Sequence, residues 1–465
     1  MKKLIMTAVA IFAISTSAIA GGLLTNTNQN AVFLRNPSRD AVIAIDGVYS
    51  NPAGTAFLEK GLHLSLSWQA AWQTREITST FPTYALNAYH PGESTRFYKG
   101  ESVAPVIPSV QMAYIFNDKW SVSAQFAVGG GGGKCEFDNG LPMFEKLVGG
   151  QLGNQIAPGK PYTMIQNLVG KQYFYGIQVG GTYKFNDNIS VFGGVRGVIA
   201  NCQYEGSISG IALDVQPVDE NNLIGPGKDA AYYLDIARKA TAVGQHLKSY
   251  RARQTAFMLQ DYVLDCSQSG FGVQPIIGIN AKLGNWNLAA KYEFRGVINL
   301  ENESKNSANV NAMFANYADG ARVRSDIPAL ATVGAQYSFS DKVRAMAGFH
   351  YFFDKDAKGA ATEVSDNTWE LTFGLEWDIT KKFTFSAGVQ RTDYGFYNDD
   401  MNDLTFNNSS TALCVGASYR VSKTVNINAG YMHSFYDDLT VTNAMGRDNY
   451  NRKNDVVGVS VDLKF

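Results

Sequence analysis

Apolar and polar residues alternate one by one along many segments of this chain, and this pattern limits the fold more than any other feature. In the last eleven residues, 455–465, one set of alternate positions carries Val457, Val459, Val461, Leu463 and Phe465. The intervening positions carry Gly458, Ser460, Asp462 and Lys464. A period of two places successive side chains on opposite faces of a β-strand. The same split recurs in segments 332–339, 369–379 and 413–420, so we expect an all-β protein.

Strand length and the position of aromatic residues distinguish a soluble sandwich from a membrane barrel. The alternating segments run for about ten residues or more, whereas strands of soluble sheets usually have five or six. Aromatic residues lie on the apolar face near the ends of these segments, as in interfacial girdles: Trp286, Tyr337, Phe339, Trp377, Tyr419 and Phe465. These two features predict a transmembrane β-barrel with a small and polar interior face.

Connections between the alternating segments are short and long in turn. Six short polar turns lie around 117–119, 186–188, 284–285, 340–342, 380–382 and 422–423. Seven longer connections lie at 76–104, 131–171, 205–270, 301–325, 354–367, 398–410 and 438–454. Short periplasmic turns and long outer loops are typical of outer-membrane barrels, and this count predicts fourteen antiparallel strands. We expect them at 61–75, 105–116, 120–130, 172–185, 189–204, 271–283, 286–300, 326–339, 343–353, 368–379, 383–397, 411–421, 425–437 and 455–465.

The first twenty residues have the composition of an export signal. Lys2 and Lys3 precede an apolar run that ends in Ala18-Ile19-Ala20. This order predicts a signal peptide at 1–20, cleaved after Ala20, and a mature protein in the bacterial outer membrane. No second apolar run approaches the roughly 20 residues of a membrane helix. The formal net charge of −1 argues against nucleic acid as a partner.

Four cysteines are present, and their spacing matches no zinc or haem pattern. Cys202 and Cys266 flank the long connection 205–270, so either a disulfide at its base or a pair of unpaired buried thiols is compatible with the sequence. No metal or cofactor is expected.

The segment before the first predicted strand, residues 21–60, is unusually long for a leader into a barrel. It contains Asn51-Pro52-Ala53-Gly54, in which Asn-Pro breaks regular structure and Ala-Gly offers no side chain for a sheet face. A tight turn into the first strand is one reading. The other is a hatch that plugs the lumen, with the barrel itself at 61–465, and we expect this hatch because the segment is apolar and needs cover.

Glycines and apolar loop residues suggest where a ligand would bind and leave. The third predicted strand ends in Gly129, Gly130, Gly131, Gly132 and Gly133, a run that weakens strand pairing. It predicts either an opening in the wall or a flexible base for the next loop. Segment 230–260 has a helical pattern and predicts one or two extracellular helices. Two outer loops carry a candidate hydrophobic groove: Leu141, Met143, Phe144, Leu147, Val148, Phe257, Met258 and Leu259. The alternative interpretation is that these side chains pack only on each other and form no groove.

Residues 50–54, placed before a fourteen-stranded barrel, resemble the FadL/TodX family of outer-membrane transporters for long-chain fatty acids and other hydrophobic compounds. Segments 105–109, 112–114 and 118–121 are similar to its second and third strands. The resemblance implies a hatch at 21–60, an Asn-Pro-Ala tract near the third strand, and ligand release sideways through the wall. Residues 35–40, Arg-Asn-Pro-Ser-Arg-Asp, depart from the small-residue tract of that family.

Charged residues at inward positions are expected to hold the hatch or to meet a ligand carboxylate. They are Arg196, Lys291, Glu293, Arg295, Arg344, Glu370, Glu376, Arg420 and Asp462. His63 and His350 are also predicted to face inward, but neither has a nucleophile and acid that would complete a triad, so no enzyme is expected.

Two classes of function remain from the sequence. The first is a plugged, monomeric channel that binds a fatty acid, an aromatic compound or another lipid within the outer-membrane lipid. The second is a non-specific porin or a barrel that serves adhesion through its loops. Residues 21–60 favour the plugged channel because a porin needs no such segment.

Overall fold

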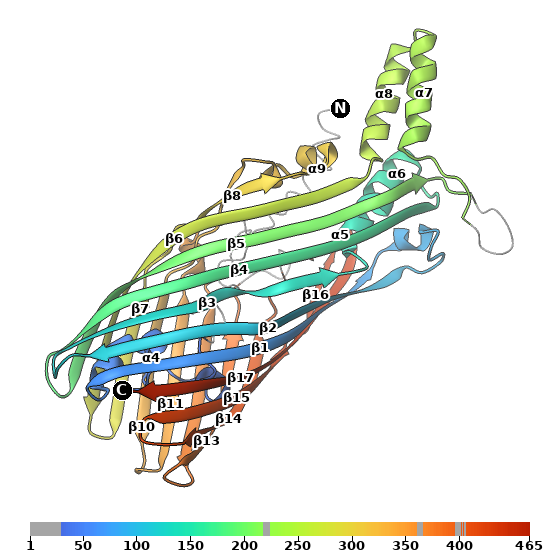
Figure 1. Ribbon diagram of the computed structural model, residues 1–465. Helices are drawn as coiled ribbons and strands as arrows, with labels where there is room; N and C mark the ends of the chain where they lie inside the picture. Colours follow the sequence, from blue (N-terminus) through green and yellow to red (C-terminus); the bar gives the residue numbers. More distant parts are fainter. Residues whose placement is uncertain (1–28, 217–223, 360–365, 396–400, 402, 404–405) are drawn as a thin grey trace.

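The computed structural model describes residues 29–216, 224–359, 366–395, 401, 403 and 406–465. Within this part of the chain, 17 β segments form one sheet that closes because β1 pairs with both β2 and β17 (Figure 1). The first six strands are β1 (Gly61–Thr80), β2 (Thr95–Ile115), β3 (Trp120–Phe137), β4 (Tyr162–Lys184), β5 (Ile189–Leu213) and β6 (Tyr262–Leu283). All their pairings are antiparallel.

Three barrel strands are each divided into two segments. They are β7 (Trp286–Glu293) with β8 (Asn299–Ser304), β9 (Arg322–Arg324) with β10 (Leu330–Ser338), and β15 (Val425–Tyr436) with β16 (Leu439–Asn443). The undivided ones are β11 (Val343–Phe352), β12 (Trp369–Asp378), β13 (Phe383–Asp393), β14 (Ser410–Arg420) and β17 (Gly446–Lys464). The 17 described segments therefore make a closed barrel of fourteen antiparallel strands, as predicted.

The first six strands are longer than predicted, and they extend into regions that were expected to be loops. Residues 76–80, 95–104, 131–137, 162–171, 205–213 and 262–270 are all strand. The sequence pattern missed these extensions because their outward positions carry charges such as Lys99, Glu101 and Glu205. A charged outer face cannot lie in hydrocarbon, so this wall rises above the bilayer on one side of the barrel.

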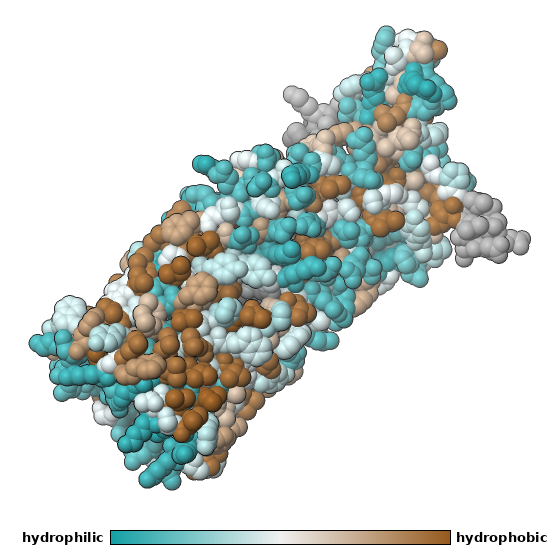
Figure 2. Space-filling view, viewed as in Figure 1, coloured by the Kyte–Doolittle hydropathy of each residue, from teal (hydrophilic) through white to brown (hydrophobic). Residues whose placement is uncertain are grey.

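An apolar belt surrounds the periplasmic half of the barrel. Figure 2 shows apolar side chains gathered there and polar ones over the extensions. Trp286, Phe339, Trp377, Tyr419 and Phe465 are exposed on the outer surface, next to the short turns or the C-terminus. This is the arrangement of an interfacial aromatic girdle. None of the described helices is both long enough and apolar enough to cross a bilayer.

Short helices lie in the extracellular loops. The connection between β5 and β6 forms a hairpin of α7 (Ala230–Ala242) and α8 (His246–Met258), which confirms the predicted helices and projects from the end of the barrel (Figure 1). The connection between β3 and β4 folds into α5 (Pro142–Glu145), η3 (Lys146–Leu152) and α6 (Gly153–Ile156). The remaining ones are η2 (Pro82–Leu86), α9 (Ala308–Met313), η4 (Ala315–Tyr317) and η5 (Asp354–Asp356).

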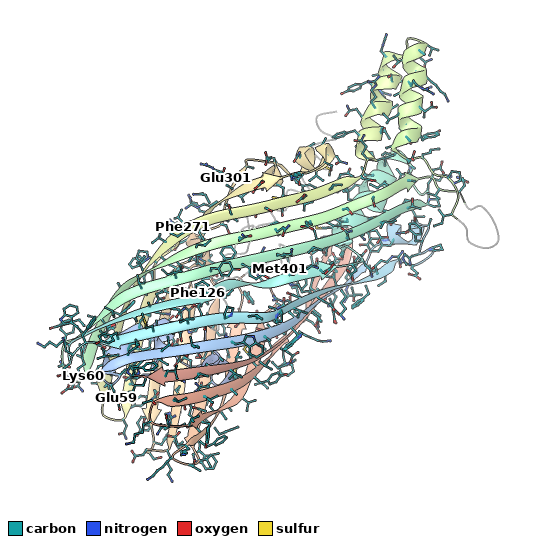
Figure 3. All side chains as sticks on the ribbon, viewed as in Figure 1. Glu59, Lys60, Phe126, Phe271, Glu301 and Met401 are labelled. Atoms are coloured by element: carbon teal, nitrogen blue, oxygen red, sulfur yellow. The ribbon has the colours of Figure 1, made fainter. Side chains whose placement is uncertain are left out.

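Residues 29–60, which we call the lumen segment, precede β1 and lie inside the barrel. They form α3 (Val32–Arg35), α4 (Gly47–Ser50) and η1 (Pro52–Phe57). Almost every residue from 29 to 56 is buried, including charged ones. Glu59 and Lys60 emerge at the periplasmic end (Figure 3). The predicted signal peptide and residues 21–28 lie outside the described residues.

Candidate functional site

A cluster of buried ions fixes one side of the lumen segment to the barrel wall. Glu376 on β12 lies 2.9 Å from Arg35 and 3.1 Å from Arg39 of the lumen segment. The same carboxylate lies 2.7 Å from Arg344 on β11. Arg39 also forms a two-point ion pair with Asp46, with a shortest distance of 2.7 Å. The charged residues that replace the expected small-residue tract therefore anchor the segment to β11 and β12.

A second anchor lies six residues further along β11, at His350. His350 lies between two carboxylates, 3.0 Å from Asp40 of the lumen segment and 2.8 Å from Glu370 on β12. Gln390 and Thr392 on β13 donate hydrogen bonds to Glu370. Sequence reasoning placed neither acid beside this histidine. Glu370 is its register partner on the neighbouring strand, whereas Asp40 lies 310 residues away in the lumen segment.

The Asn51-Pro52-Ala53-Gly54 tract packs against β4, β5 and β6. The Asn51 amide donates to Asn280 on β6 at 2.7 Å, and its own side-chain oxygen accepts from the Gly54 backbone at 3.1 Å. The hydroxyls of Thr182 on β4 and Ser190 on β5 donate to the carbonyls of Pro52 and Ala53. The tract therefore caps η1 and lies mainly on these three strands, with fewer contacts to the third strand to which the resemblance assigned it.

Tyr49 of the lumen segment lies beneath two cations of the wall. The Lys291 ammonium is 4.3 Å and the Arg196 guanidinium 4.9 Å from the centre of its ring. Both cations pair with Glu293, and Lys291 also donates to the Tyr49 carbonyl at 2.9 Å. These three predicted lumen charges therefore bind one another and the lumen segment.

Three other residues that were predicted to face inward lie nearer to solvent. Arg295 is in the interruption between β7 and β8, near Asp326. Arg420 is exposed at the periplasmic end of β14. His63 contacts the carbonyl of Glu59 at that same end. By contrast, Asp462 is inside and accepts a hydrogen bond from Ser65 at 2.7 Å.

The start of the lumen segment meets β1, β2 and β3 through uncharged groups alone. Asn30 donates to Ser65 on β1 at 2.9 Å and to Gln111 on β2 at 2.8 Å. Gln125 on β3 donates to Gln29. Neutral hydrogen bonds are individually weaker than charge-assisted ones, so this side of the segment is held less firmly than the ionic side.

The wall is interrupted between β2 and β3, close to Gln29. Val103 pairs with Lys134 and Ser109 pairs with Ala127, but residues 104–108 and 128–133 between them have no partner across this ladder. Both stretches still pair with the strands on their other sides, β1 and β4. The glycine run lies inside β3 rather than in the following loop. Gly131 and Gly133 have φ of +83° and +90°. The register with β4 shifts between Val128 and Gly130 and again between Gly131 and Gly133.

Two prolines on β2 face this interruption and were not recognised as part of it from the sequence. Pro105 and Pro108 have no backbone N–H and cannot donate to a neighbouring strand. The sequence feature that could have revealed the interruption is the Pro-Val-Ile-Pro stretch, which lies opposite the five glycines once β2 and β3 are paired. Val106 between the prolines is 64% exposed on the lipid side.

The two apolar outer loops pack together over the lumen in one cluster, which we call the cap cluster. Its buried members are Leu147, Val148, Leu152, Tyr162, Met164, Ile208, Ile211, Leu213, Leu259, Tyr262 and Val310. Met143, Phe144 and Met258 pack on its edge. Leu141 is buried in a neighbouring cluster with Phe137, Leu168 and Phe406. Most of the predicted groove residues therefore contact one another, and Phe257 belongs to neither cluster.

Buried polar groups fasten the loop under the cap cluster. Glu145 accepts hydrogen bonds from Asn87, Tyr98 and Tyr162. Lys146 pairs with Asp448 at 2.5 Å. Nearby, Asp403 accepts from the Met143 backbone and from Tyr450; burial first and Asp448 second raise the pKa of Asp403 to about 6.

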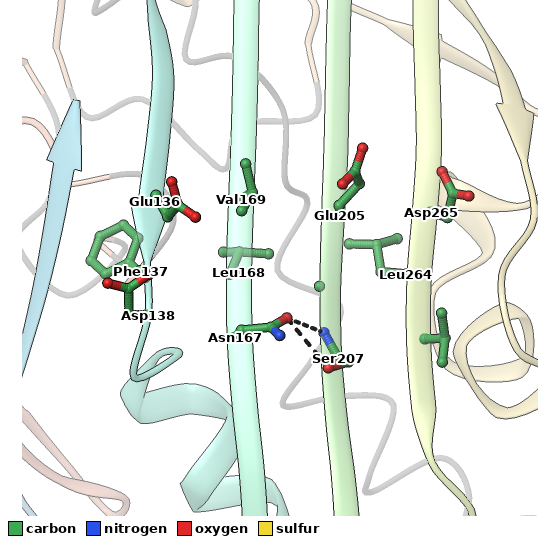
Figure 4. Close-up of a pocket in the computed structure, with 12 residues that line it drawn as sticks. Glu136, Phe137, Asp138, Asn167, Leu168, Val169, Glu205, Ser207, Leu264 and Asp265 are labelled. Carbon is green, nitrogen blue, oxygen red and sulfur yellow. Dashed lines mark hydrogen bonds between the residues drawn. The ribbon is translucent and has the colours of Figure 1, made fainter. Parts of the chain in front are cut away.

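A cavity of about 500 Å³ opens between the extended parts of β3, β4, β5 and β6 (Figure 4). Phe137, Leu168 and Leu264, which pack in the clusters below, contribute apolar lining. The rim carries the carboxylates Glu136, Asp138, Glu205 and Asp265. The lining of this cavity is therefore more acidic than the apolar groove that the sequence suggested.

Cys202 and Cys266 do not form the disulfide that was considered. All four cysteines are free thiols. The pair lies on adjacent strands, but Cys202 is opposite Gln268 and Cys266 is opposite Tyr204. The extended β5–β6 ladder already closes the base of the loop. Among the described residues, no group of three or more His, Cys, Asp or Glu side chains is placed to hold a metal.

The closed barrel is similar to known structures over nearly all of the chain. A FadL homologue from Pseudomonas aeruginosa aligns over 96% of this chain and 100% of its own, with 14% identity and a TM-score of 0.65. The P. putida toluene transporter TodX aligns over 96% and 98%, with 15% identity and a TM-score of 0.60. The chain has the FadL/TodX fold.

A family model described as Gram-negative porin matches residues 242–439. No curated protein matches the sequence. The FadL/TodX fold, the porin match and the lipid-facing apolar belt identify the chain as an integral β-barrel of the bacterial outer membrane.

Proposed function

We propose that this protein is a passive outer-membrane channel for hydrophobic small molecules, which bind beneath the cap cluster and leave sideways through the wall between β2 and β3. One observation carries this proposal: the unpaired stretches 104–108 and 128–133 lie beside the start of the lumen segment. Unpaired backbone at membrane depth is costly and is kept where it lines a cavity or is covered by protein. A passage for an apolar molecule would explain why the wall keeps this unpaired backbone.

The second irregular region of the wall is built differently. Between β6 and β8, and between β7/β8 and β9/β10, the strands also lose their regular partners. There, however, Gly296 and Ile327 exchange two backbone hydrogen bonds of 3.0 and 2.8 Å, and Phe294 donates to Pro275 at 2.9 Å. Glycines and prolines oppose each other only between β2 and β3 among the described ladders, which favours that position for release.

Neighbouring proteins support a hydrophobic ligand. TodX is a toluene transporter, and the P. aeruginosa structure is a FadL homologue. By this analogy the ligand here is fatty acid-like, aromatic or another lipid. A non-specific porin is less well supported because the buried lumen segment occupies the pore, and adhesion alone would leave the wall interruption without a role.

Filling the interruption tests lateral release. A Cβ at Gly129 would lie 3.6 Å from Gln29 and from the Phe174 carbonyl, which is ordinary contact, so Gly129 tolerates a side chain. In Gly129→Phe the ring would occupy the space beside the unpaired stretches. We expect uptake of oleate and toluene by cells expressing the protein to fall at least about tenfold, while the amount of folded barrel is unchanged.

Gly193→Phe is the matched control, because a Cβ at Gly193 on β5 meets nothing within 4 Å. Normal uptake by Gly129→Phe would rule out release at this position. Replacing the whole glycine run with alanine is a poorer test. A Cβ at Gly131 would lie 2.2 Å from the Gln172 carbonyl at a positive φ, so that variant reports on folding.

A further inference from the structure

Two arginines lie directly opposite each other on the seam that closes the barrel. Arg75 on β1 and Arg452 on β17 are register partners, so their Cβ atoms are about 5 Å apart. Each guanidinium lies over an aromatic ring, Arg75 at 5.4 Å from the centre of Phe406 and Arg452 at 4.7 Å from the centre of Tyr436. Both side chains point into the lumen, since inward neighbours on the same strands, Ile77 and Tyr450, are buried in the interior.

Neither arginine has an acidic partner among the described residues. Arg75 donates to Gln73 at 3.2 Å, and Arg452 donates to the Phe406 carbonyl and the Asn407 amide oxygen at 3.4 and 3.3 Å. Arg452 is only 9% exposed, and its Nε has no hydrogen-bond partner among the described residues. By contrast, the lumen arginines Arg35, Arg39 and Arg196 all have carboxylate partners.

This arrangement is unfavourable by itself. Like charges directly opposite each other in a sheet repel, and a buried charge without a counter-ion is costly. Ionisable residues kept in such positions inside membrane proteins commonly serve a ligand. Two forked guanidinium groups side by side match the oxygens of a carboxylate or phosphate, which would restore the missing charge balance.

The arginine pair lies between two apolar layers on the proposed ligand path. On the extracellular side is the cluster that contains Ile77, Phe406 and Tyr450. On the periplasmic side, Phe33 and Leu34 of the lumen segment pack with Val456, and Ala71 packs on this group. Ala71 is opposite Ala104, the first residue of the unpaired stretch on β2. Arg75 is four residues from Ala71, about 13 Å along the strand.

We propose that Arg75 and Arg452 form a binding site for the oxyanion headgroup of an amphiphilic ligand, whose apolar tail lies toward the β2–β3 interruption. This site rests on the proposed channel function and narrows its ligand to a molecule with one anionic end and one apolar chain. The aromatic rings of Phe406 and Tyr436 hold the two guanidinium groups in place for the ligand.

Three probes with the same dodecyl chain separate the headgroup from the tail: laurate, dodecyl phosphate and the neutral dodecanol. Each is titrated into the full-length protein in a nonionic detergent, and binding is followed by intrinsic fluorescence. The variants are Arg75→Gln, Arg452→Gln and the charge-retaining Arg75→Lys. Arg238→Gln on α7 is the control, because Arg238 is exposed and pairs only with Asp235. Heat-modifiable migration in gels confirms that each barrel is folded.

We expect the wild-type protein to bind at least one anionic probe about 10- to 100-fold more tightly than dodecanol. Either glutamine variant should lose this preference while keeping its affinity for dodecanol, and Arg75→Lys should retain part of it. Preference for laurate over dodecyl phosphate, or the reverse, identifies a carboxylate or a phosphate as the natural headgroup.

Equal affinity of the wild-type protein for all three probes would overturn the headgroup site and leave the channel proposal intact. Equal weakening of all three probes in the glutamine variants would also overturn it, because the arginines would then only support the structure. Failure of every probe, dodecanol included, would contradict the channel proposal itself.

Discussion

At the scale of single residues, the lumen segment is held by a small number of buried charges on one side and by amides and hydroxyls on the other. Glu376 has Arg35, Arg39 and Arg344 within 3.1 Å. Removal of this carboxylate leaves Arg35 without an acidic partner among the described residues, whereas Arg39 keeps Asp46 and Arg344 keeps Asp378. A buried cation that loses its counter-ion is strongly destabilising. Glu376 is therefore expected to contribute strongly to holding the lumen segment.

Glu376→Gln should loosen the lumen segment by roughly 3–5 kcal/mol, because the arginines lose their common partner. Single-channel recording in planar bilayers should show more frequent openings for this variant than for the wild-type protein. Glu59→Gln is the control, since Glu59 pairs with Lys464 at the exposed periplasmic end. A silent Glu376→Gln channel would show that the ionic anchor is not what holds the segment.

Asp354, in η5 outside the spanning strands, gives a pH-dependent contribution to stability. Burial raises its pKa from 3.8 to about 6, although hydrogen bonds from Thr368 oppose the shift. The folded state therefore holds this proton more tightly than the unfolded state, so the contribution is complete below about pH 4 and is lost as pH rises through 6. Between low pH and pH 7, the contribution of Asp354 to the free energy of unfolding changes by on the order of 3 kcal/mol.

Asp354→Asn removes this titration while keeping the shape of the side chain. We expect the variant to be more stable than the wild-type protein at pH 7 and to lack the decline between pH 4 and 6, as measured by denaturant unfolding in detergent. Parallel pH profiles for the two proteins would contradict the raised pKa. Asp341→Asn in a periplasmic turn serves as the control.

At the scale of elements, the sequence predicts those parts that face lipid and misses those that do not. The fourteen strands follow from alternation in the belt, as in β12 with Leu371, Phe373 and Leu375 on its outer face. The extensions of β2 and β5 above the belt have charged outer faces, so they lack the apolar alternation that predicts a membrane strand. Only the glycine side of the β2–β3 interruption was predicted, because the five glycines are adjacent in sequence. The prolines of β2 come to lie opposite them only when β2 and β3 pair.

The sequence predicted that inward charges would hold the lumen segment, but it did not predict which residues would pair. Inward charges such as Arg196, Glu293 and Glu376 could be found by parity along their strands. Their partners come from segments up to 341 residues away, as for Arg35 and Glu376, and strand parity has no information about the path of an irregular segment. The same reason explains why Asp40 was not assigned to His350.

The α7–α8 hairpin stands clear of the barrel, and its own local interactions carry its stability. Asp229 accepts a hydrogen bond from the Tyr232 backbone at 2.8 Å and so caps α7. Asp229→Ala should cost about 1 kcal/mol locally, which speeds amide exchange in α7 about fivefold. Hydrogen exchange with mass spectrometry measures this, and exchange in β5 and β6 should not change. Asp235→Ala, which removes only exposed ion pairs, should have a smaller effect.

At the scale of the whole molecule, the barrel is a cylinder with one tall wall, an outer cap and an occupied lumen. The membrane belt, the cap cluster and the lumen segment are separate parts of the molecule. On the route proposed above, a molecule would disturb the cap cluster and the start of the lumen segment, and it would not need to displace the ionic anchors on β11 and β12.

Deletion of residues 21–50 should convert the closed channel into an ion-conducting one, because it removes α3, α4 and both ionic anchors. We expect a large and steady conductance from the deletion variant in planar bilayers and little conductance from the full-length protein. Equal conductance of the two proteins would mean that the pore is closed by something other than the lumen segment.

The seam between β1 and β17 sets the order in which this protein can be assembled. The two strands are separated by nearly the whole chain, so their pairing is among the most remote contacts in sequence and is expected to form late. The lumen segment precedes β1 and contacts both β4–β6 and β11–β15. It must therefore be wrapped by the growing sheet before the seam seals, so that the plug is enclosed during biogenesis rather than inserted into a finished pore.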